Sequence, residues 1–216
     1  NQEFTRYQAF ARWLADLIHD EPGLRQISGL SLGGVVTATA LVQVPGAFDR
    51  SLLMTPQFDV VEPQNQQLPL LNTILSTSRG NWGPSCEIER AGGRGGYCQF
   101  TLGNVRAAQL VGQEALARMD SVSATVQIVG VEGDKAIANS ALALAVRRLP
   151  FGSGCLYAGG ANHSLVSRYD APQENKFWLG SLHSQLLRFV SSDIFFDLLP
   201  EPPHEVGLPR CRISGT

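Results

Sequence analysis

The stretch Gly29–Gly34, with the sequence GLSLGG, decides the fold that this chain is predicted to adopt. A short apolar strand candidate, Leu24–Ser28, precedes it, and an apolar helical segment, Val35–Val44, follows it directly. A Gly-x-Ser-x-Gly motif between a strand and a helix is typical of a sharp turn that lifts a serine hydroxyl clear of the backbone. The sequence therefore predicts such a turn, with Ser31 at its tip.

Strand and helix candidates alternate along the chain from residue 24 onward, after a first helix candidate. The predicted helices are Phe4–Asp20, Val35–Val44, Asn104–Met119, Ala136–Leu149 and Lys176–Phe189, and the predicted strands are Leu24–Ser28, Arg50–Thr55, Ala124–Val131 and Gly154–Ala158. Such alternation is typical of an α/β fold with a mostly parallel sheet that helices flank on both faces. Functional side chains of these folds gather at the carboxyl ends of the strands.

The composition excludes several classes of protein. Of the 216 residues, 44% are hydrophobic and 17% are charged, which excludes an intrinsically disordered chain. The formal net charge is −2, so the chain lacks the strongly basic composition of a nucleic-acid-binding protein. The longest apolar run, Val35–Val44, is shorter than the roughly 18 residues of a transmembrane helix. These features predict a soluble globular domain.

Ser31 is the candidate nucleophile. A serine hydroxyl reacts only when a base takes its proton. Gly29 and Gly33 are expected to be required because side chains at both positions would collide as the strand and the helix close on each other. The backbone N–H of Leu32 lies at the predicted helix start and is the candidate donor to a developing oxyanion. The alternative is a tight glycine-rich turn in which the serine is incidental.

Asp134 is the candidate acid, because it follows the most apolar strand candidate, Ala124–Val131. A carboxylate at that place can accept a hydrogen bond from an imidazole and stabilise its charged form. Glu132 is a rival, but Asp134 is preferred because it lies past the strand end, after the flexible Gly133. The alternative is that Asp134 is the N-cap of the following helix, a position that aspartate favours.

His163 is the candidate base among four histidines. It alone lies in a glycine-rich loop directly after a strand candidate, whereas His19 and His183 fall on helices and His204 falls in the tail. The alternative is a loop histidine bonded to the backbone. The sequence Asn162–Ser164 also matches a glycosylation site, which we interpret as coincidence because a glycan there would block the base.

The motif and the chain order Ser31, Asp134, His163 resemble the α/β-hydrolase family, the serine esterases, lipases and thioesterases. The resemblance covers residues 4 to 192. It implies hydrolysis of a carboxylic ester or thioester by a Ser-Asp-His triad through an acyl-enzyme, with a small-molecule or lipid acyl substrate and no metal or other cofactor. It also implies a core at residues 1–56 and 104–192 and a cap or lid insertion at 57–103.

The chain departs from the family at its N-terminal side. The serine turn of the family follows about the fifth strand, but here one strand candidate precedes it. We therefore expect the missing strands and a second oxyanion donor to belong to an N-terminal segment outside this chain, or the fold to be a reduced variant. An acyltransferase with the same triad and a non-catalytic hydrolase-like binding domain are the alternative functions.

The four cysteines predict two disulfides. Cys86 and Cys98 enclose a glycine-rich segment of the predicted cap, and the pair Cys155–Cys211 would tether a proline-rich tail, residues 193–216. Disulfides would place the protein outside the cytoplasm, in a secreted, periplasmic or lumenal location; four free thiols are the alternative. The leucines of the predicted cap indicate either an apolar acyl pocket or a small core beneath the cap.

Overall fold

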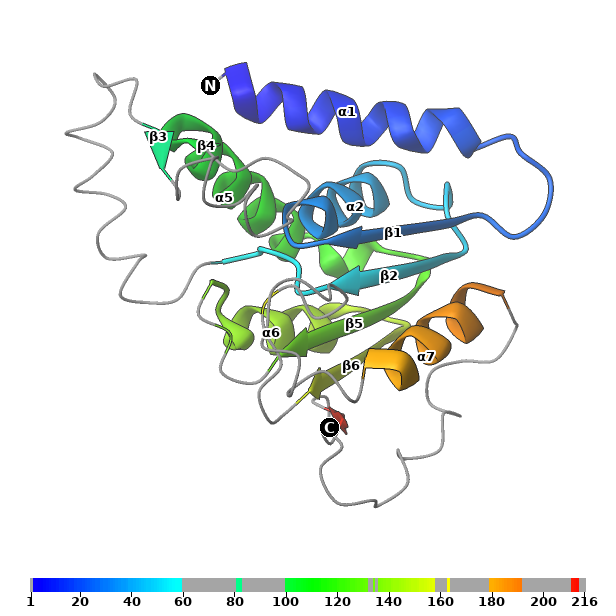
Figure 1. Cartoon of the computed structure of the whole chain (residues 1–216). Helices are drawn as coiled ribbons and strands as arrows, with labels where there is room; N and C mark the ends of the chain where they lie inside the picture. Colours follow the sequence, from blue (N-terminus) through cyan, green and yellow to red (C-terminus); the bar gives the residue numbers. More distant parts are fainter. Residues whose placement is uncertain are drawn as a thin grey trace.

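A five-stranded sheet forms the centre of the protein in the computed structural model (Figure 1). The structure describes residues 2–59, 81–82, 100–131, 134, 136–157, 163, 179–191 and 211–213. Its order is β1-β2-β5-β6-β7. The strands are β1 (Gln26–Leu30), β2 (Arg50–Met54), β5 (Thr125–Val131), β6 (Gly152–Tyr157) and β7 (Cys211–Ile213). The first four pair in parallel, and β7 pairs antiparallel with β6. The mostly parallel α/β sheet predicted from the sequence is confirmed.

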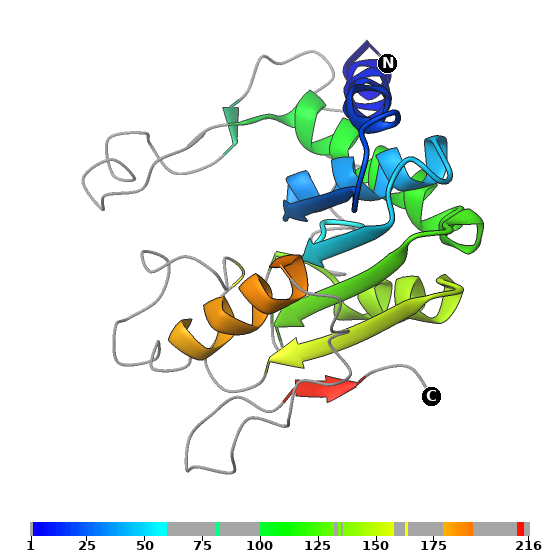
Figure 2. The ribbon, with the colours of Figure 1, turned by 90° about the vertical axis from the view of Figure 1, so that its right-hand side faces the viewer.

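Helices cover both faces of this sheet, as Figure 2 shows. They are α1 (Gln2–Ile18), α2 (Leu32–Gln43), α5 (Leu102–Ala117), α6 (Asn139–Arg148) and α7 (Leu179–Ser191), with the short 3-10 helix η1 (Met119–Ser121) after α5. α7 lies on one face, and α2, α5 and α6 lie on the other. α1 packs on α2 and α5. Because α2 is apolar all round, it lies between α1 and the sheet with nine of its residues buried.

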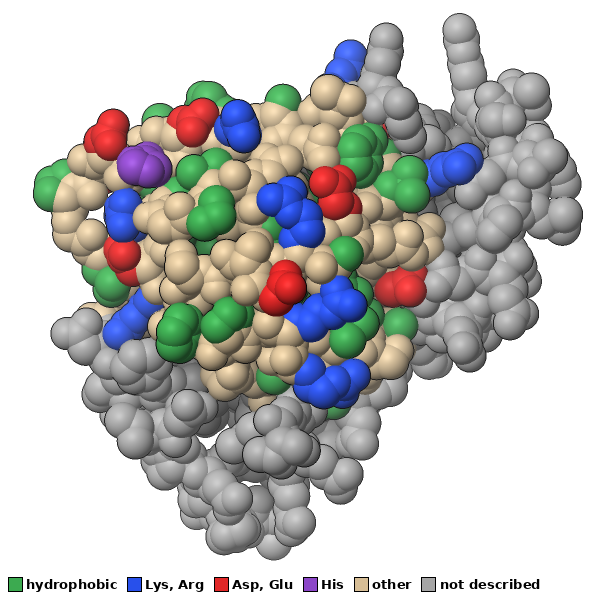
Figure 3. All heavy atoms as spheres, turned by 180° about the vertical axis from the view of Figure 1, so that it is seen from behind, with side chains coloured by type: hydrophobic (Ala, Val, Ile, Leu, Met, Phe, Trp, Pro, Cys, Tyr) green, Lys and Arg blue, Asp and Glu red, His purple; other side chains and the backbone are tan. Residues whose placement is uncertain are grey.

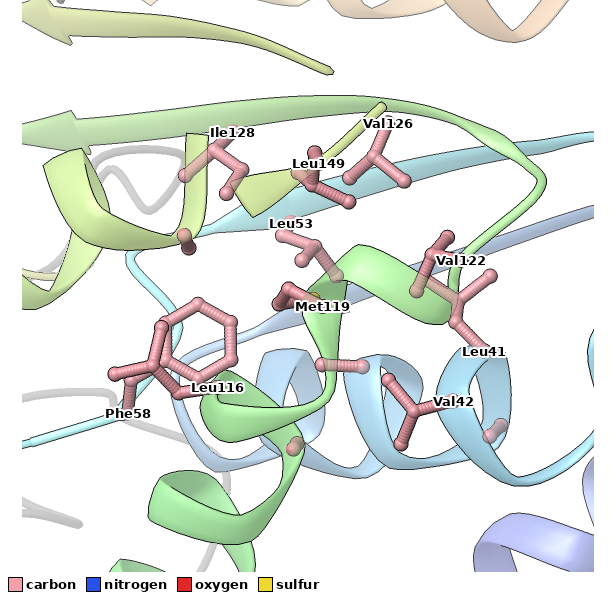
Figure 4. Close-up of a cluster of buried hydrophobic side chains, with 14 of the residues drawn as sticks. Leu41, Val42, Leu53, Phe58, Leu116, Met119, Val122, Val126, Ile128 and Leu149 are labelled. Carbon is pink, nitrogen blue, oxygen red and sulfur yellow. The ribbon is translucent and has the colours of Figure 1, made fainter. Parts of the chain in front are cut away.

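The main hydrophobic core fills the space between the sheet and the helices α2, α5 and α6 (Figure 4). The sheet contributes Leu53 of β2 and Val126 and Ile128 of β5. Alternate residues of a strand face opposite sides of a sheet, so these side chains all lie on the α2 side. Met119 of η1 is fully buried among them. This core fixes the relative positions of β1, β2 and β5, and thereby of their carboxyl ends.

Polar side chains attach α7 to the opposite face. The Gln26 amide donates to the carbonyl of Val190 at 2.8 Å, and the Arg50 guanidinium donates to the carbonyl of Phe189 at 3.4 Å. The guanidinium also lies 6.0 Å from the centre of the Phe189 ring. The last carbonyls of a helix have no partner within the helix, and a cation at this end is favourable. The sheet thus caps the C-terminal turn of α7.

The observed elements differ from the predicted ones at α2 and β7, and each difference has a physical reason. α2 begins at Leu32 rather than Val35, because tertiary packing outweighs the low helix propensity of Gly33 and Gly34. β7 was not predicted, since three residues in a proline-rich tail give no periodic signal. The side chains of all four cysteines lie outside the described residues, although the pairing of β6 with β7 places the backbone of Cys211 opposite Tyr157.

Most of the predicted cap at 57–103, with its Cys86–Cys98 loop and its leucines, lies outside the described residues. Two short strands, β3 (Asn81–Trp82) and β4 (Phe100–Thr101), pair antiparallel there. In the described part of the chain, no helix has both the length and the apolar character needed to cross a membrane. Acidic and basic side chains are interspersed on the face that Figure 3 shows.

Candidate active site

Ser31 stands at the turn between β1 and α2 with an unusual backbone conformation. Its φ of 53° and ψ of −116° lie outside the regions that ordinary residues adopt. Its own N–H donates to the carbonyl of Met54 at 2.9 Å, and its carbonyl accepts from Val35 at 3.2 Å, in the first turn of α2. Ser31 is the N-cap residue of α2, yet its hydroxyl makes no capping bond. The hydroxyl is therefore directed elsewhere.

The glycines of the turn have distinct roles. A Cβ on Gly29 would lie 2.2 Å from the carbonyl oxygen of Gly33, so strand and helix close only because residue 29 has no side chain. The same expectation for Gly33 is wrong, because a Cβ there would meet nothing within 4 Å. The second close approach occurs at Gly34, where a Cβ would lie 2.9 Å from the Cβ of Pro56.

The imidazole of His163 lies between Ser31 and the carboxylate of Asp134. Its Nε2 is 2.8 Å from Ser31 Oγ, and its Nδ1 is 2.8 Å from Asp134 Oδ2. An ionised carboxylate can only accept, so Nδ1 carries the proton and Nε2 is left to accept the serine hydroxyl hydrogen. The structure thus brings together three side chains that the sequence places far apart.

Asp134 divides its two carboxylate oxygens between two tasks. Oδ1 accepts the backbone N–H groups of Ala136 at 2.7 Å and Ile137 at 3.3 Å, while Oδ2 meets His163. The side chain is fully buried. The N-cap of α6 is Ala138, so Asp134 stabilises the turn before α6 rather than capping that helix. The rival Glu132 lies outside the described residues.

The remaining histidines do not join this group in the described structure. His19 pairs with its neighbour Asp20 at 3.1 Å on the surface, His183 lies on α7, and His204 lies outside the described residues. Among the described residues, no cluster of three His, Cys, Asp or Glu side chains could hold a metal ion. The helix start adds a further chemical group, since the first N–H groups of α2, including that of Leu32, have no partner within the helix.

Sequence reasoning missed a fourth polar residue at this place. Thr55 follows β2, is fully buried, and donates its hydroxyl hydrogen to the backbone carbonyl of His163 at 2.9 Å. Its signal in the sequence is a polar residue that closes an apolar strand, RSLLMT, at the same sheet edge as Ser31. The three strands β1, β2 and β5 therefore each contribute a residue at or beyond their carboxyl ends.

We compared the chain with protein families, curated proteins and solved structures. No protein-family model matches the sequence, and no curated protein matches it. Solved structures are similar. A soluble variant of monoglyceride lipase from Saccharomyces cerevisiae, in complex with a substrate analogue, has a TM-score of 0.62 and 14% identity, covering 87% of this chain and 68% of its own. The monoacylglycerol lipase of Paleococcus ferrophilus has a TM-score of 0.63 and 12% identity, and the match covers 85% of this chain and 74% of the lipase.

The similarity is not confined to lipases. BpoC from Mycobacterium tuberculosis, named as a candidate non-heme bromoperoxidase, has a TM-score of 0.55 and 14% identity, covering 85% of this chain and 72% of its own. Together with the sheet order and the turn at Ser31, these likenesses show that the chain has the α/β-hydrolase fold. One fold hosts several reactions, so the function must be argued from the site.

Proposed function

We propose that the protein is a serine hydrolase that cleaves a carboxylic ester or thioester. The observation that carries the proposal is the unbroken chain of hydrogen bonds from Ser31 Oγ through both nitrogens of His163 to Asp134 Oδ2. An arrangement of nucleophile, base and orienting acid is the recurring requirement of nucleophilic catalysis by serine. Ser31 would be the nucleophile, His163 the general base and acid, and Asp134 the group that steadies the imidazolium.

The reaction would run through an acyl-enzyme. His163 Nε2 takes the proton of the Ser31 hydroxyl as Oγ attacks the carbonyl carbon of the substrate. The tetrahedral intermediate then expels the alcohol or thiol, which leaves with the proton that His163 returns. A water molecule attacks the acyl group in the same way, its proton passing to His163, and Ser31 regains a proton as the acid departs.

The start of α2 supports the charge that develops during attack. The N–H of Leu32 follows the nucleophile directly and belongs to the N-terminal turn of α2, where unpaired N–H groups and the helix dipole favour negative charge. We therefore assign Leu32 N–H to the stabilisation of the oxyanion. Asp134 contributes through its buried position, since a carboxylate without water around it interacts more strongly with an imidazolium.

The nature of the substrate rests on the similar structures. Two of them are named as lipases of monoglyceride or monoacylglycerol, which favours a carboxylic ester with an apolar acyl chain over a thioester. An acyltransferase would use the same three residues, with an alcohol in place of water. Analysis of the products formed from an ester with and without an added alcohol would distinguish these two outcomes.

Labelling with a fluorophosphonate probe tests the proposal, because the probe reacts with a serine that a neighbouring base activates. We expect native protein to be labelled at Ser31 and both Ser31→Ala and heat-denatured protein to stay unlabelled. Ser28→Ala is the matched control, since Ser28 is an exposed serine of β1 and its loss leaves the labelling unchanged. A native preparation that stays unlabelled would favour a non-catalytic binding domain.

A further inference from the structure

Thr55 has a backbone conformation that its residue type resists. Its φ is 41°, in the left-handed region, and a β-branched side chain is a rare outlier there. Among the described residues other than glycine, Ser31 and Thr55 are the two with positive φ. Strained residues persist where surrounding contacts hold them, and they cluster at functional sites. The strained backbone of Thr55 therefore suggests that this residue has a role in the candidate active site.

The contacts of Thr55 connect β5 with the loop of the base. Its N–H donates to the carbonyl of Val129 at 2.6 Å, which holds its backbone to β5, the strand that leads to Asp134. Its hydroxyl donates to the carbonyl of His163 at 2.9 Å. The residue is fully buried, so water does not compete for either bond. Thr55 thus fixes the main chain of the base relative to the strand before the acid.

Its neighbours connect the same short segment, residues 54–57, with the nucleophile. The carbonyl of Met54 accepts the N–H of Ser31 at 2.9 Å, and the N–H of Gln57 donates to the carbonyl of Ser31 at 3.2 Å. Pro56 presses against Gly34 at the start of α2. Because β2 lies between β1 and β5 (Figure 1), segment 54–57 contacts the elements that carry all three members of the hydrogen-bond chain.

We infer that Thr55 is a positioning residue, whose hydroxyl holds the backbone of His163 so that the imidazole spans the gap between Ser31 and Asp134. The inference rests on the proposed function. A side chain that reacts with substrate must be held closely in place, since a displacement of about 1 Å can lower the rate about a hundredfold. A merely structural role would leave the reactivity of folded protein unchanged, because the hydroxyl would only satisfy a buried carbonyl.

Three substitutions separate these roles. Thr55→Ser keeps the hydroxyl, Thr55→Val keeps the shape without it, and Thr55→Gly removes it while relieving the strained φ, so that the backbone stays folded. Thr39→Val is the matched control. The hydroxyl of Thr39 is also buried and donates to a backbone carbonyl, that of Val35 at 2.8 Å, but within α2 and away from the base.

The reactivity of each folded variant is measured as the rate of fluorophosphonate labelling and as kcat and KM for p-nitrophenyl butyrate. We expect Thr55→Val and Thr55→Gly to lose about 10- to 100-fold in kcat and labelling rate with little change in KM. Thr55→Ser should stay within about threefold of wild type, and Thr39→Val should match it. Wild-type rates in Thr55→Gly, or an equal loss in Thr55→Ser, would overturn the inference.

A second measurement tests the placement of His163 without any activity. In proton NMR, an Nδ1–H bonded to a carboxylate gives a signal at low field. We expect this signal in wild type, Thr55→Ser and Thr39→Val, and its loss or broadening in Thr55→Gly. An unchanged Nδ1–H signal in Thr55→Gly would contradict the positioning role of Thr55, even if the wild-type protein proves unreactive. If the wild-type protein is not labelled but the Nδ1–H signals follow the expected pattern across the variants, only the proposed function is disproved.

Discussion

At the scale of single residues, the site depends on Asp134 and Ser31, which each use one atom for the local fold and another for the contact with His163. Asp134 binds the turn before α6 with one oxygen and His163 with the other. Ser31 begins α2 with its carbonyl and reaches the imidazole with its hydroxyl. Substitutions that keep the shape but alter one of these atoms therefore separate folding from chemistry.

Asp134→Asn is the sharpest of these changes. The amide keeps an oxygen that can accept from Ala136, but its NH₂ would face Nδ1 of His163 and favour the tautomer with the proton on Nε2. That tautomer cannot accept the serine proton, so kcat should fall about 10⁴-fold while the protein still folds. Steady-state kinetics and circular dichroism check this. Asp120→Asn, at an exposed carboxylate of η1, is the control, and unaltered kcat in Asp134→Asn would disprove the assignment.

Alanine should destabilise the protein at Gly29 but not at Gly33. Gly29→Ala should destabilise the protein by about 1–3 kcal/mol, because its Cβ would overlap the backbone of Gly33. Gly33→Ala should be neutral or stabilising by up to about 1 kcal/mol, since the methyl group meets nothing and alanine favours a helix. Urea denaturation of both variants measures the difference. Equal destabilisation would show that the turn is packed differently.

At the scale of elements, one set of polar contacts attaches α7 to the sheet, and another joins the segments that precede β1 and β2. On one face the side chains of Gln26 and Arg50 cap the end of α7. At the amino ends of β1 and β2, the carboxylate of Asp49 receives two hydrogen bonds from the Arg25 side chain, at 3.2 and 3.0 Å, and one from its backbone at 2.8 Å. Both attachments lie at the opposite end of the strands from the candidate active site.

Arg50→Met should loosen α7 without altering the core. The change keeps an apolar stem of similar length but removes the guanidinium that contacts Phe189. Because hydrogen bonds to charged groups contribute roughly 1.5–3 kcal/mol, we expect a loss of about that size in the free energy of unfolding. Hydrogen exchange should rise in the last turn of α7 and not in α5. Arg147→Met, at an exposed site on α6, is the control, and unchanged exchange in α7 would argue against the capping role.

The attachment of Asp49 gives stability that depends on pH. The hydrogen bonds from the Arg25 side chain and backbone hold the pKa of the Asp49 carboxyl below its usual value. A lowered folded pKa adds stability above the unfolded pKa of about 3.9, and that stability is lost as the pH falls through the folded pKa. The side chain is 39% exposed, so solvent screening keeps the contribution below about 1 kcal/mol.

Asp49→Asn should therefore lower Tm near neutral pH and have a smaller effect below about pH 3, where the wild-type carboxyl also loses its charge. Thermal unfolding of both proteins across this range measures the difference, which should also shrink in high salt. Asp16→Asn, at an exposed site of α1, should show no such trend. A Tm difference that does not depend on pH would contradict the electrostatic origin.

At the scale of the whole molecule, the cysteines bear on where the protein matures. β6 and β7 pair with Cys155 opposite Ile213 and Cys211 opposite Tyr157, so the two cysteines lie two register positions apart on neighbouring strands. The disulfides Cys86–Cys98 and Cys155–Cys211 stay predictions from the sequence, because the side chains of all four cysteines lie outside the described residues. Peptide mapping of unreduced protein, refolded in a glutathione redox buffer, should recover both linked pairs. Alkylation of all four thiols without reductant would favour the free-thiol alternative and a reducing compartment.

The sequence predicts those features that depend on neighbouring residues, but not the contacts between residues far apart in the chain. The alternation of apolar segments predicts the sheet and its helices, because burial imposes a local period. The motif around Ser31 predicts the turn because its glycines and its serine all lie within one short stretch of sequence. The contact of Gly34 with Pro56 and the bond from Thr55 to His163 join residues that no local pattern connects. Such partners depend on the register of strands, which a single sequence does not contain.

The order of the strands also has a consequence for folding. β1, α2 and β2 lie within residues 26–54, so this unit can close early with a small loss of chain entropy. Pairing of β2 with β5 joins distant parts of the chain, and long-range parallel pairing is slow. The serine turn should therefore form before Asp134 and His163 arrive. During refolding, reactivity at Ser31 should appear last and report the completion of the sheet rather than the formation of the turn.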